Sequence, residues 1–274
     1  MVTATTEQLP ATPTPTRKAR PILAWLVGIA VLAAMAIVGV MYVRGKLLGD
    51  EPSHWPSTDL GATEVVEYKQ TSKRPLHLHL FKPQESPTAT IVFFHGGGLQ
   101  RTPLDQFVRQ SQYLAEHGML AVVAEYRVRW DGAGFAEASA DAGDAVAWIR
   151  DHADQLGIPA DKIAASGASA GGMLAASTEL NNDDRHPNVL VLFNPAVSAR
   201  SANPNGGVPT LVMHGDSDKT VALSSAQGFC DSLSSCEMMI WPGGDHGFFN
   251  DGDAYKATLA RVDQFLRSLG YLTT

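Results

Sequence analysis

The sequence has little cysteine, which limits the chemistry open to the chain. Only two cysteines, Cys230 and Cys236, occur among its 274 residues. One ends a helix-like stretch and the other begins a strand-like run, so the pair can come within disulfide reach. In an oxidising compartment we expect the bond to form, and two free thiols are the alternative. A catalytic cysteine is not expected, because Ser169 lies in a far more typical nucleophile sequence.

Positive charge is also scarce. The chain carries a formal net charge of −7, and residues 1–46 contribute +4 to it, leaving −11 for residues 47–274. A domain with this excess of acidic groups repels nucleic acid and anionic lipid. The charge balance therefore favours an exported enzyme over a nucleic-acid-binding protein.

Charge is absent altogether from one segment near the N-terminus, residues 22–43. At 1.5 Å per residue, a helix of this length spans a hydrocarbon core of ~30 Å. Lys and Arg flank both ends, and Trp25 and Tyr42 lie where interface aromatics are common. We expect a retained transmembrane anchor, with the N-terminus cytoplasmic and the remainder of the chain outside the cytoplasm. The alternative is a signal peptide cleaved at Ala34-Met35-Ala36, which would release a secreted protein.

The segments on either side of residues 22–43 have few apolar side chains that could form a core. Residues 1–21 are rich in Thr and Pro and are predicted to form a disordered tail, and residues 44–60 are predicted to form a polar linker. Residues 61–274 form one predicted domain in which short apolar runs alternate with helical patterns. We expect strands at residues 76–82, 89–94, 119–125, 163–166, 189–193, 210–214 and 237–241, and helices at 104–117, 137–155, 171–180, 221–234 and 253–269. This alternation predicts an α/β fold with a mostly parallel sheet covered on both faces.

A G-x-S-x-G pentapeptide, Gly167-Ala168-Ser169-Ala170-Gly171, lies between a strand-like run and a helix-like stretch. Strand, sharp turn and helix is the context of a nucleophile elbow, in which small residues must flank the serine. The helix N-terminus then directs free N–H groups at the reacting centre. Ser169 is therefore the candidate nucleophile.

A glycine-rich segment, His95-Gly96-Gly97-Gly98, follows the apolar run 89–94. Glycines at the end of a strand let backbone N–H groups approach a ligand closely, as stabilisation of an oxyanion requires. We assign the oxyanion hole to the N–H groups of Gly97, Gly98 and Ala170. A flexible turn or a phosphate loop is the alternative, although no G-K-[ST] sequence follows to complete a P-loop.

Two further loops complete a catalytic set. Asp218, with Asp216 as the alternative, follows the apolar run 210–214 and can orient a histidine. Either aspartate can instead cap the next helix. His246 lies among glycines after the run 237–241 and can exchange a proton near neutral pH. The order Ser169, Asp218, His246 differs from the orders found in chymotrypsin and subtilisin.

A metal site is not expected. His77 and His79 share one face of a predicted strand, but we expect no cluster of Cys, Asp or Glu beside them.

These motifs together resemble the α/β-hydrolases of the esterase/lipase group over roughly residues 61–271. The chain is most similar to small acetyl-esterase-like enzymes related to bifunctional feruloyl and acetyl-xylan esterases. The likeness is carried by Phe94-His95-Gly96-Gly97-Gly98, Ala124-Glu125-Tyr126-Arg127-Val128, Ser166-Gly167-Ala168-Ser169-Ala170-Gly171-Gly172, Phe193-Asn194-Pro195-Ala196, His214-Gly215-Asp216-Ser217-Asp218 and Gly243-Gly244-Asp245-His246-Gly247-Phe248.

The resemblance implies ester hydrolysis through an acyl-enzyme, without a metal or organic cofactor, and assigns the triad aspartate to Asp218. The chain departs from the group at Leu99, where a bulky aromatic is common, and in its short segment between Pro195 and Pro209. We expect a carboxylesterase that acts on short acyl esters, with carbohydrate esters as candidate substrates. The alternatives are a prolyl-oligopeptidase-like serine peptidase and a non-catalytic, membrane-tethered binding protein.

Overall fold

The computed structural model describes residues 59–181, 185–203 and 205–272. The predicted tail, the predicted membrane anchor at residues 22–43 and nearly all of the predicted linker lie outside these residues. Within the described ranges, no helix is long and apolar enough to cross a bilayer.

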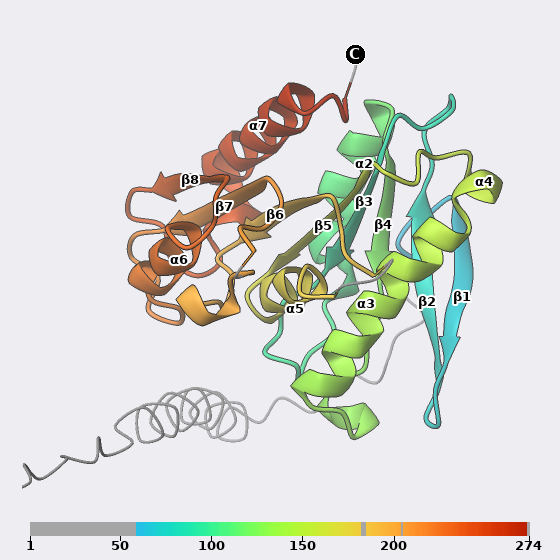
Figure 1. Ribbon diagram of the computed structural model, residues 1–274, viewed down its shortest axis with the longest axis horizontal. Coiled ribbons are helices and arrows are strands. Elements are labelled where there is room, and N and C mark those ends of the chain that lie inside the picture. The colour runs from blue at the N-terminus through green and yellow to red at the C-terminus, as the bar shows by residue number, and fades with distance from the viewer. Residues whose placement is uncertain (1–58, 182–184, 204, 273–274) are drawn as a thin grey trace, which may run out of the picture. The chain divides into compact units, whose positions relative to one another are not determined.

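An eight-stranded sheet forms the centre of the domain, with the strand order β1-β2-β4-β3-β5-β6-β7-β8 (Figure 1). Its strands are β1 (Glu64–Gln70), β2 (Pro75–Phe81), β3 (Thr90–Phe94), β4 (Leu120–Ala124), β5 (Ile163–Ala168), β6 (Val189–Phe193), β7 (Thr210–Gly215) and β8 (Cys236–Trp241). β2 pairs antiparallel with both β1 and β4, and every other pairing is parallel. The sheet is therefore mostly parallel, as the alternating pattern predicted.

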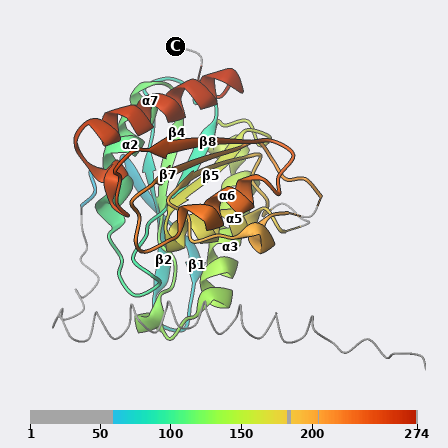
Figure 2. The same cartoon turned by 90° about the vertical axis from the view of Figure 1, so that its left-hand side faces the viewer.

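Helices cover both faces of this sheet (Figures 1 and 2). The α-helices are α2 (Val108–Glu116), α3 (Phe135–Asp151), α4 (Ala153–Leu156), α5 (Ala170–Thr178), α6 (Leu223–Cys230) and α7 (Gly252–Ser268), and the short 3-10 helices are η1 (Leu104–Phe107), η2 (Arg129–Asp131), η3 (Ala199–Ser201) and η4 (Phe248–Asn250). Side chains of α3, α5 and α6 share one apolar core, and those of α2 and α7 share the other.

Strand β6 shows why the central strands are continuous apolar runs in the sequence. Leu190 and Leu192 belong to the core under α3, α5 and α6, whereas Val191 and Phe193 belong to the core under α2 and α7. Successive side chains of a strand point to opposite faces, so a strand covered on both sides needs an apolar residue at every position.

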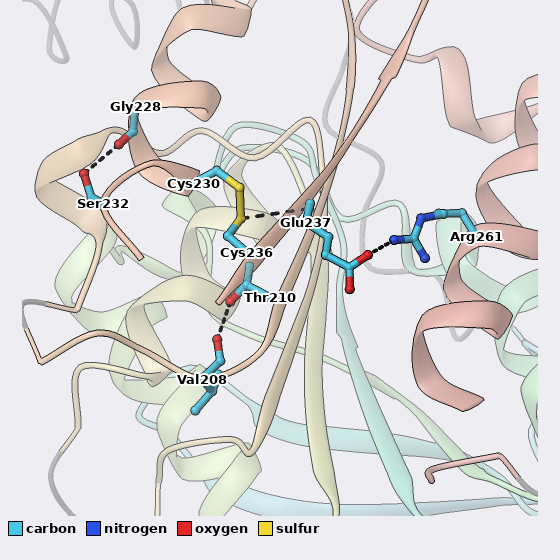
Figure 3. Close-up of a disulfide and its surroundings, with 8 residues drawn as sticks. All are labelled: Val208, Thr210, Gly228, Cys230, Ser232, Cys236, Glu237 and Arg261. Atoms are coloured by element: carbon cyan, nitrogen blue, oxygen red, sulfur yellow. Dashed lines mark hydrogen bonds and ion pairs between the residues drawn. A yellow bond between two sulfur atoms is a disulfide. The ribbon is translucent and has the colours of Figure 1, made fainter. Parts of the chain in front are cut away.

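The two cysteines lie at the junction of α6 and β8. Cys230 is the last residue of α6, Cys236 is the first of β8, and their sulfurs are bonded with the Cα atoms 5.4 Å apart (Figure 3). Next to this bond, Glu237 of β8 pairs with Arg261 of α7. The disulfide therefore closes the segment between α6 and β8 into a covalent loop.

Candidate active site

Ser169 is the single residue between β5 and α5, where it caps the helix with φ 53° and ψ −117°. A positive φ is unfavourable for a residue with a side chain, and such strain concentrates at functional turns. The neighbouring glycines are required by packing. A Cβ on Gly171 would overlap the backbone oxygen of Phe94, and a Cβ on Gly172 would lie 2.9 Å from the Cβ of Pro195.

His246 and Asp218 meet beside this turn, although 28 residues separate them in sequence. His246 Nδ1 lies 2.7 Å from Asp218 Oδ2. The other carboxylate oxygen of Asp218 accepts hydrogen bonds from the N–H groups of Thr220, at 2.7 Å, and Val221, at 3.0 Å. His214 Nε2 also lies 3.3 Å from Asp218 Oδ2. A carboxylate held in this way fixes the imidazole with its proton on Nδ1.

The environment of Asp218 favours its ionised form. Burial of the side chain by itself raises the pKa, but the hydrogen bonds from His214 and His246, and then those from the backbone of Val221 and Thr220, lower it by more. The pKa of Asp218 consequently lies well below its usual range. The carboxylate keeps its charge wherever His246 would act as a base.

Asp216, the alternative orienting group, has a different role. Its side chain is exposed, and its Oδ1 accepts a hydrogen bond of 2.7 Å from the N–H of Gly243. Gly243 belongs to the loop that carries His246. Of the two aspartates, the structure brings Asp218 to the imidazole and places Asp216 where it supports the loop.

The glycine turn lies beside the nucleophile. Gly97, Gly98 and Leu99 have φ values of 107°, 64° and 60°, so three consecutive residues adopt left-handed conformations. Among the described residues, the N–H groups of Gly97 and Gly98 donate no hydrogen bond. Ala170 is the first residue of α5, so its N–H has no acceptor within the helix. Among the described residues, none of the three donors assigned from the sequence therefore has a hydrogen-bond acceptor.

Two side chains that sequence reasoning did not assign hold this turn. Gln106 Oε1 accepts a hydrogen bond of 2.7 Å from the N–H of Gly96. Tyr126 donates a hydrogen bond of 2.7 Å to the backbone oxygen of His95, and the two rings stack at 4.4 Å. Burial lowers the pKa of His95 to about 4, so its ring is neutral at physiological pH. The Tyr126-Arg127 segment is part of the family likeness in the sequence, but the contact between Tyr126 and His95 arises only in the tertiary structure.

Asn194 belongs to a segment that carries the family likeness, but no feature of the sequence assigns it a role in the site. Its side chain is 1% exposed, and its Nδ2 lies 3.0 Å from His246 Nδ1 and 3.1 Å from His246 Nε2. Because Nδ1 donates to Asp218, only Nε2 can accept a hydrogen bond from this amide. Asn194 has a φ of 36°, and its Oδ1 is buried without a partner among the described residues. Asn194 therefore lies against the nitrogen that a general base would use.

Ser169 Oγ forms no hydrogen bond with a described side chain. The partner expected for this hydroxyl, His246 Nε2, lies 3.1 Å from Asn194 Nδ2 instead. Catalytic hydrogen bonds often tighten only in the complex with substrate, so this geometry is compatible with a serine–histidine pair.

His77 and His79 share one acidic neighbour in the structure. Glu125, which follows β4, lies 3.5 Å from His77 Nδ1 and 3.3 Å from His79 Nε2, so an acidic group does accompany them. This carboxylate follows β4, which is distant from β2 in sequence and becomes its neighbour only in the sheet. Arg74 binds the same carboxylate at 2.5 Å. No group of three or more His, Cys, Asp or Glu side chains in the described part of the chain is placed to hold a metal.

Comparison with known proteins identifies relatives of the whole domain. A family model named BD-FAE matches residues 76–203. The structure of esterase 2 from Thermogutta terrifontis with bound propionate is 31% identical, with a TM-score of 0.74 over 81% of this chain and 99% of that one. The same enzyme phosphonylated by cyclosarin is 33% identical, with a TM-score of 0.75 over 81% and 99% of the two chains. The fold and these matches define an α/β-hydrolase, and the chain belongs to the esterase family of that fold.

Curated relatives match over a shorter stretch. An arylesterase from Saccharolobus solfataricus is 31% identical over 127 residues, which is 46% of this chain and 41% of the relative. An ethyl acetate hydrolase from Pseudomonas putida is 31% identical over 141 residues, covering 47% and 43%. The matched region thus spans less than half of these curated relatives.

Proposed function

We propose that the chain is a serine carboxylesterase that acts through an acyl-enzyme. The observation that carries the proposal is the 2.7 Å contact between His246 Nδ1 and Asp218 Oδ2 beside the strained turn of Ser169. A histidine oriented by a buried carboxylate, next to a serine at a helix N-terminus, is the arrangement that activates a hydroxyl nucleophile.

Each candidate residue has a defined part in the reaction. His246 Nε2 takes the proton of Ser169 as Oγ attacks the ester carbonyl. The N–H groups of Gly97, Gly98 and Ala170 stabilise the resulting oxyanion, and each such donor is worth roughly 3–4 kcal/mol of barrier. His246 then returns the proton to the leaving alcohol, and water repeats the sequence to release the acid.

Short acyl esters are the proposed substrates, and acetylated carbohydrates are the candidates. The named relatives include acetyl esterases and an ethyl acetate hydrolase, and the Thermogutta enzyme has been seen with propionate and butyrate. Residues 22–43 are proposed to anchor the enzyme in the membrane, with the catalytic domain outside the cytoplasm; release after signal cleavage is the alternative.

A fluorophosphonate probe tests the nucleophile. The full chain should be labelled once, and mass spectrometry should place the label on Ser169. The Ser169→Ala variant should lose the label, whereas Ser217→Ala, a matched change beside Asp218, should keep it. Labelling of another residue, or none at all in folded protein, would contradict a serine hydrolase and favour a silent binding domain. Turnover of a prolyl amide but not of any ester would favour a peptidase.

A further inference from the structure

A second histidine contacts the carboxylate of Asp218. His214 lies in β7, directly before the last residue of the strand, and its side chain is fully buried. Its Nε2 lies 3.3 Å from Asp218 Oδ2 and 3.1 Å from the backbone oxygen of Val221. The reaction proposed above gives this ring no part, although it shares one oxygen of Asp218 with His246.

The two contacts of His214 Nε2 determine where the ring carries its proton. The backbone oxygen of Val221 and the ionised carboxylate of Asp218 are both acceptors only, so Nε2 must be the donor. The other nitrogen, Nδ1, is buried and has no hydrogen-bond partner among the described residues. A second proton on Nδ1 would therefore lack an acceptor, and the ring is the neutral tautomer with its hydrogen on Nε2.

The carboxylate of Asp218 is fully occupied by donors. Oδ1 accepts from the N–H groups of Thr220, at 2.7 Å, and Val221, at 3.0 Å. Oδ2 accepts from His246 Nδ1, at 2.7 Å, and from His214 Nε2. A carboxylate offers about four lone-pair positions, so these bonds fill its capacity. Of these donors, His214 alone acts on the same oxygen as His246.

His214 also differs from the backbone donors in the element that carries it. Thr220 and Val221 belong to the same loop as Asp218 and move with it, whereas His214 belongs to β7. This strand is paired with β6 on one side and β8 on the other (Figure 1). The bond from His214 therefore holds the carboxylate to the rigid sheet, and a group on a strand is held more precisely than a group on a loop.

We propose that His214 is a positioning residue for the esterase reaction, because its Nε2–H holds Asp218 Oδ2 in place and takes up part of the charge that His246 uses. This inference rests on the proposed function. Loss of the donor has two consequences. The carboxylate loses an anchor on the strand, so His246 is oriented less well. The charge on Oδ2 is no longer shared, so it stabilises protonated His246 more strongly.

Few other charges bear on this contact. His214 and His246 are the ionisable side chains bonded to Asp218 among the residues that the structure describes. The charged residues nearest to them in the chain are exposed, and they are Asp216, Lys219 and Asp245. Solvent and salt screen such exposed charges. A change of pH profile on substitution of His214 therefore reports on the contact with Asp218.

Hydrolysis of p-nitrophenyl acetate by the full chain, followed across the acidic limb of kcat/KM, tests the proposal. His214→Phe keeps a buried ring but removes the donor, so kcat should fall roughly tenfold and the acidic limb should move to higher pH. His214→Gln places an amide nitrogen as many bonds from Cβ as Nε2 is. It should keep kcat within about threefold of the parent, with the parent's pH profile.

His152→Phe is the matched control. The ring of His152 also donates to a backbone oxygen, that of Trp148 at 2.8 Å, but it lies at the end of α3. Its kinetics and pH profile should equal those of the parent.

The tautomer of His214 is measured without substrate. In ¹⁵N NMR of the full chain with labelled histidines, the signals that His214→Gln lacks should show a proton on Nε2 and none on Nδ1 at neutral pH. This measurement decides the contact even where His214→Phe does not fold. Absence of ester turnover by the folded parent would instead contradict the esterase proposal, so the two failures are distinguishable.

Four results would overturn the proposal. Folded His214→Phe with the parent's kcat and pH profile would show that the donor is not needed. A lower kcat with an unmoved profile would show that the ring acts by packing alone. Equal losses in His214→Phe and His214→Gln would do the same. A proton on Nδ1 of His214 would exclude the bond to Asp218.

Discussion

Asp218 and Asp216 lie two residues apart in one loop, yet their surroundings give them different functions. Asp218 is buried and receives hydrogen bonds from two histidines and two backbone N–H groups, whereas Asp216 is exposed and holds the N–H of Gly243. Only the first position can keep an imidazole oriented and stabilise its protonated form.

The two aspartates can therefore be separated by mutation. Asp218→Asn should lower kcat for a short ester by roughly 10³–10⁴-fold, because an amide cannot stabilise the imidazolium of His246. Asp216→Asn, the matched control, should cost less than about tenfold, since the amide oxygen can still accept from Gly243. Steady-state kinetics on both folded variants give the comparison. The reverse ranking would assign the orienting role to Asp216.

Asn194 is predicted to position His246. Asn194→Gly relieves the positive φ and removes the amide, so kcat should fall by roughly tenfold, the equivalent of one net hydrogen bond. Asn194→Asp keeps the shape but places an acceptor for a proton on His246 Nε2, so the acidic limb of the kcat/KM profile should move to higher pH. Unchanged kinetics and an unchanged profile in both variants would show that Asn194 is only a packing residue.

Among the elements, the central strands could be predicted because burial on both faces leaves an apolar run that is readable in the sequence. β1 (Glu64–Gln70) was missed for the opposite reason. It pairs only with β2 at the edge of the sheet, and most of its residues are polar and partly exposed. Charged, exposed edge strands keep a sheet from pairing with strands of other molecules. Such a strand lacks the apolar run by which a strand is recognised in the sequence.

The residues of the candidate site likewise divide into those that the sequence predicts and those that it does not. Ser169, the glycine turn and His246 could be predicted from local sequence motifs, because their backbone conformations require glycine at neighbouring positions. The contacts of Asn194, Gln106 and Glu125 carry no such signature. They arise where strands or helices remote in sequence become neighbours, and a single sequence does not reveal that pairing.

The link between α6 and β8 should contribute measurably to stability. Cys230 and Cys236 are six residues apart, and closing so short a loop is worth about 2 kcal/mol. The double variant Cys230→Ser/Cys236→Ser should lose about that much free energy of unfolding in urea, with ester hydrolysis retained because Ser169 and His246 lie elsewhere. A variant as stable as the parent under oxidising conditions would show that the bond does not stabilise the domain.

The domain as a unit is predicted to be acid-labile. The pKa values of Glu125, Asp141, Asp218 and Asp263 are all lowered in the folded chain by hydrogen bonds and ion pairs that outweigh burial. The unfolded chain therefore binds more protons in the acidic range, so folding stability is present above a pH of about 4 and falls as the pH drops through the folded pKa values. Glu179, whose pKa is raised, contributes with the opposite sign.

Urea unfolding at several pH values checks this balance. The free energy of unfolding should decrease steadily between about pH 5 and pH 3. Asp141 is fully buried and pairs with Lys69, at 2.5 Å, and Arg127, at 2.8 Å. Asp141→Asn should lower stability at pH 7 and make the curve shallower. A stability that is constant or rises toward pH 3 would contradict the assignment of these carboxylates.

The most direct measurement is hydrolysis of p-nitrophenyl acetate by the purified full chain beside its Ser169→Ala variant. If Ser169, His246 and Asp218 form the reacting group, the parent should turn over the ester and the variant should lose at least about 10³-fold in kcat while remaining folded. Equal turnover by both proteins, or no turnover by folded parent on any short acyl ester, would contradict a serine carboxylesterase.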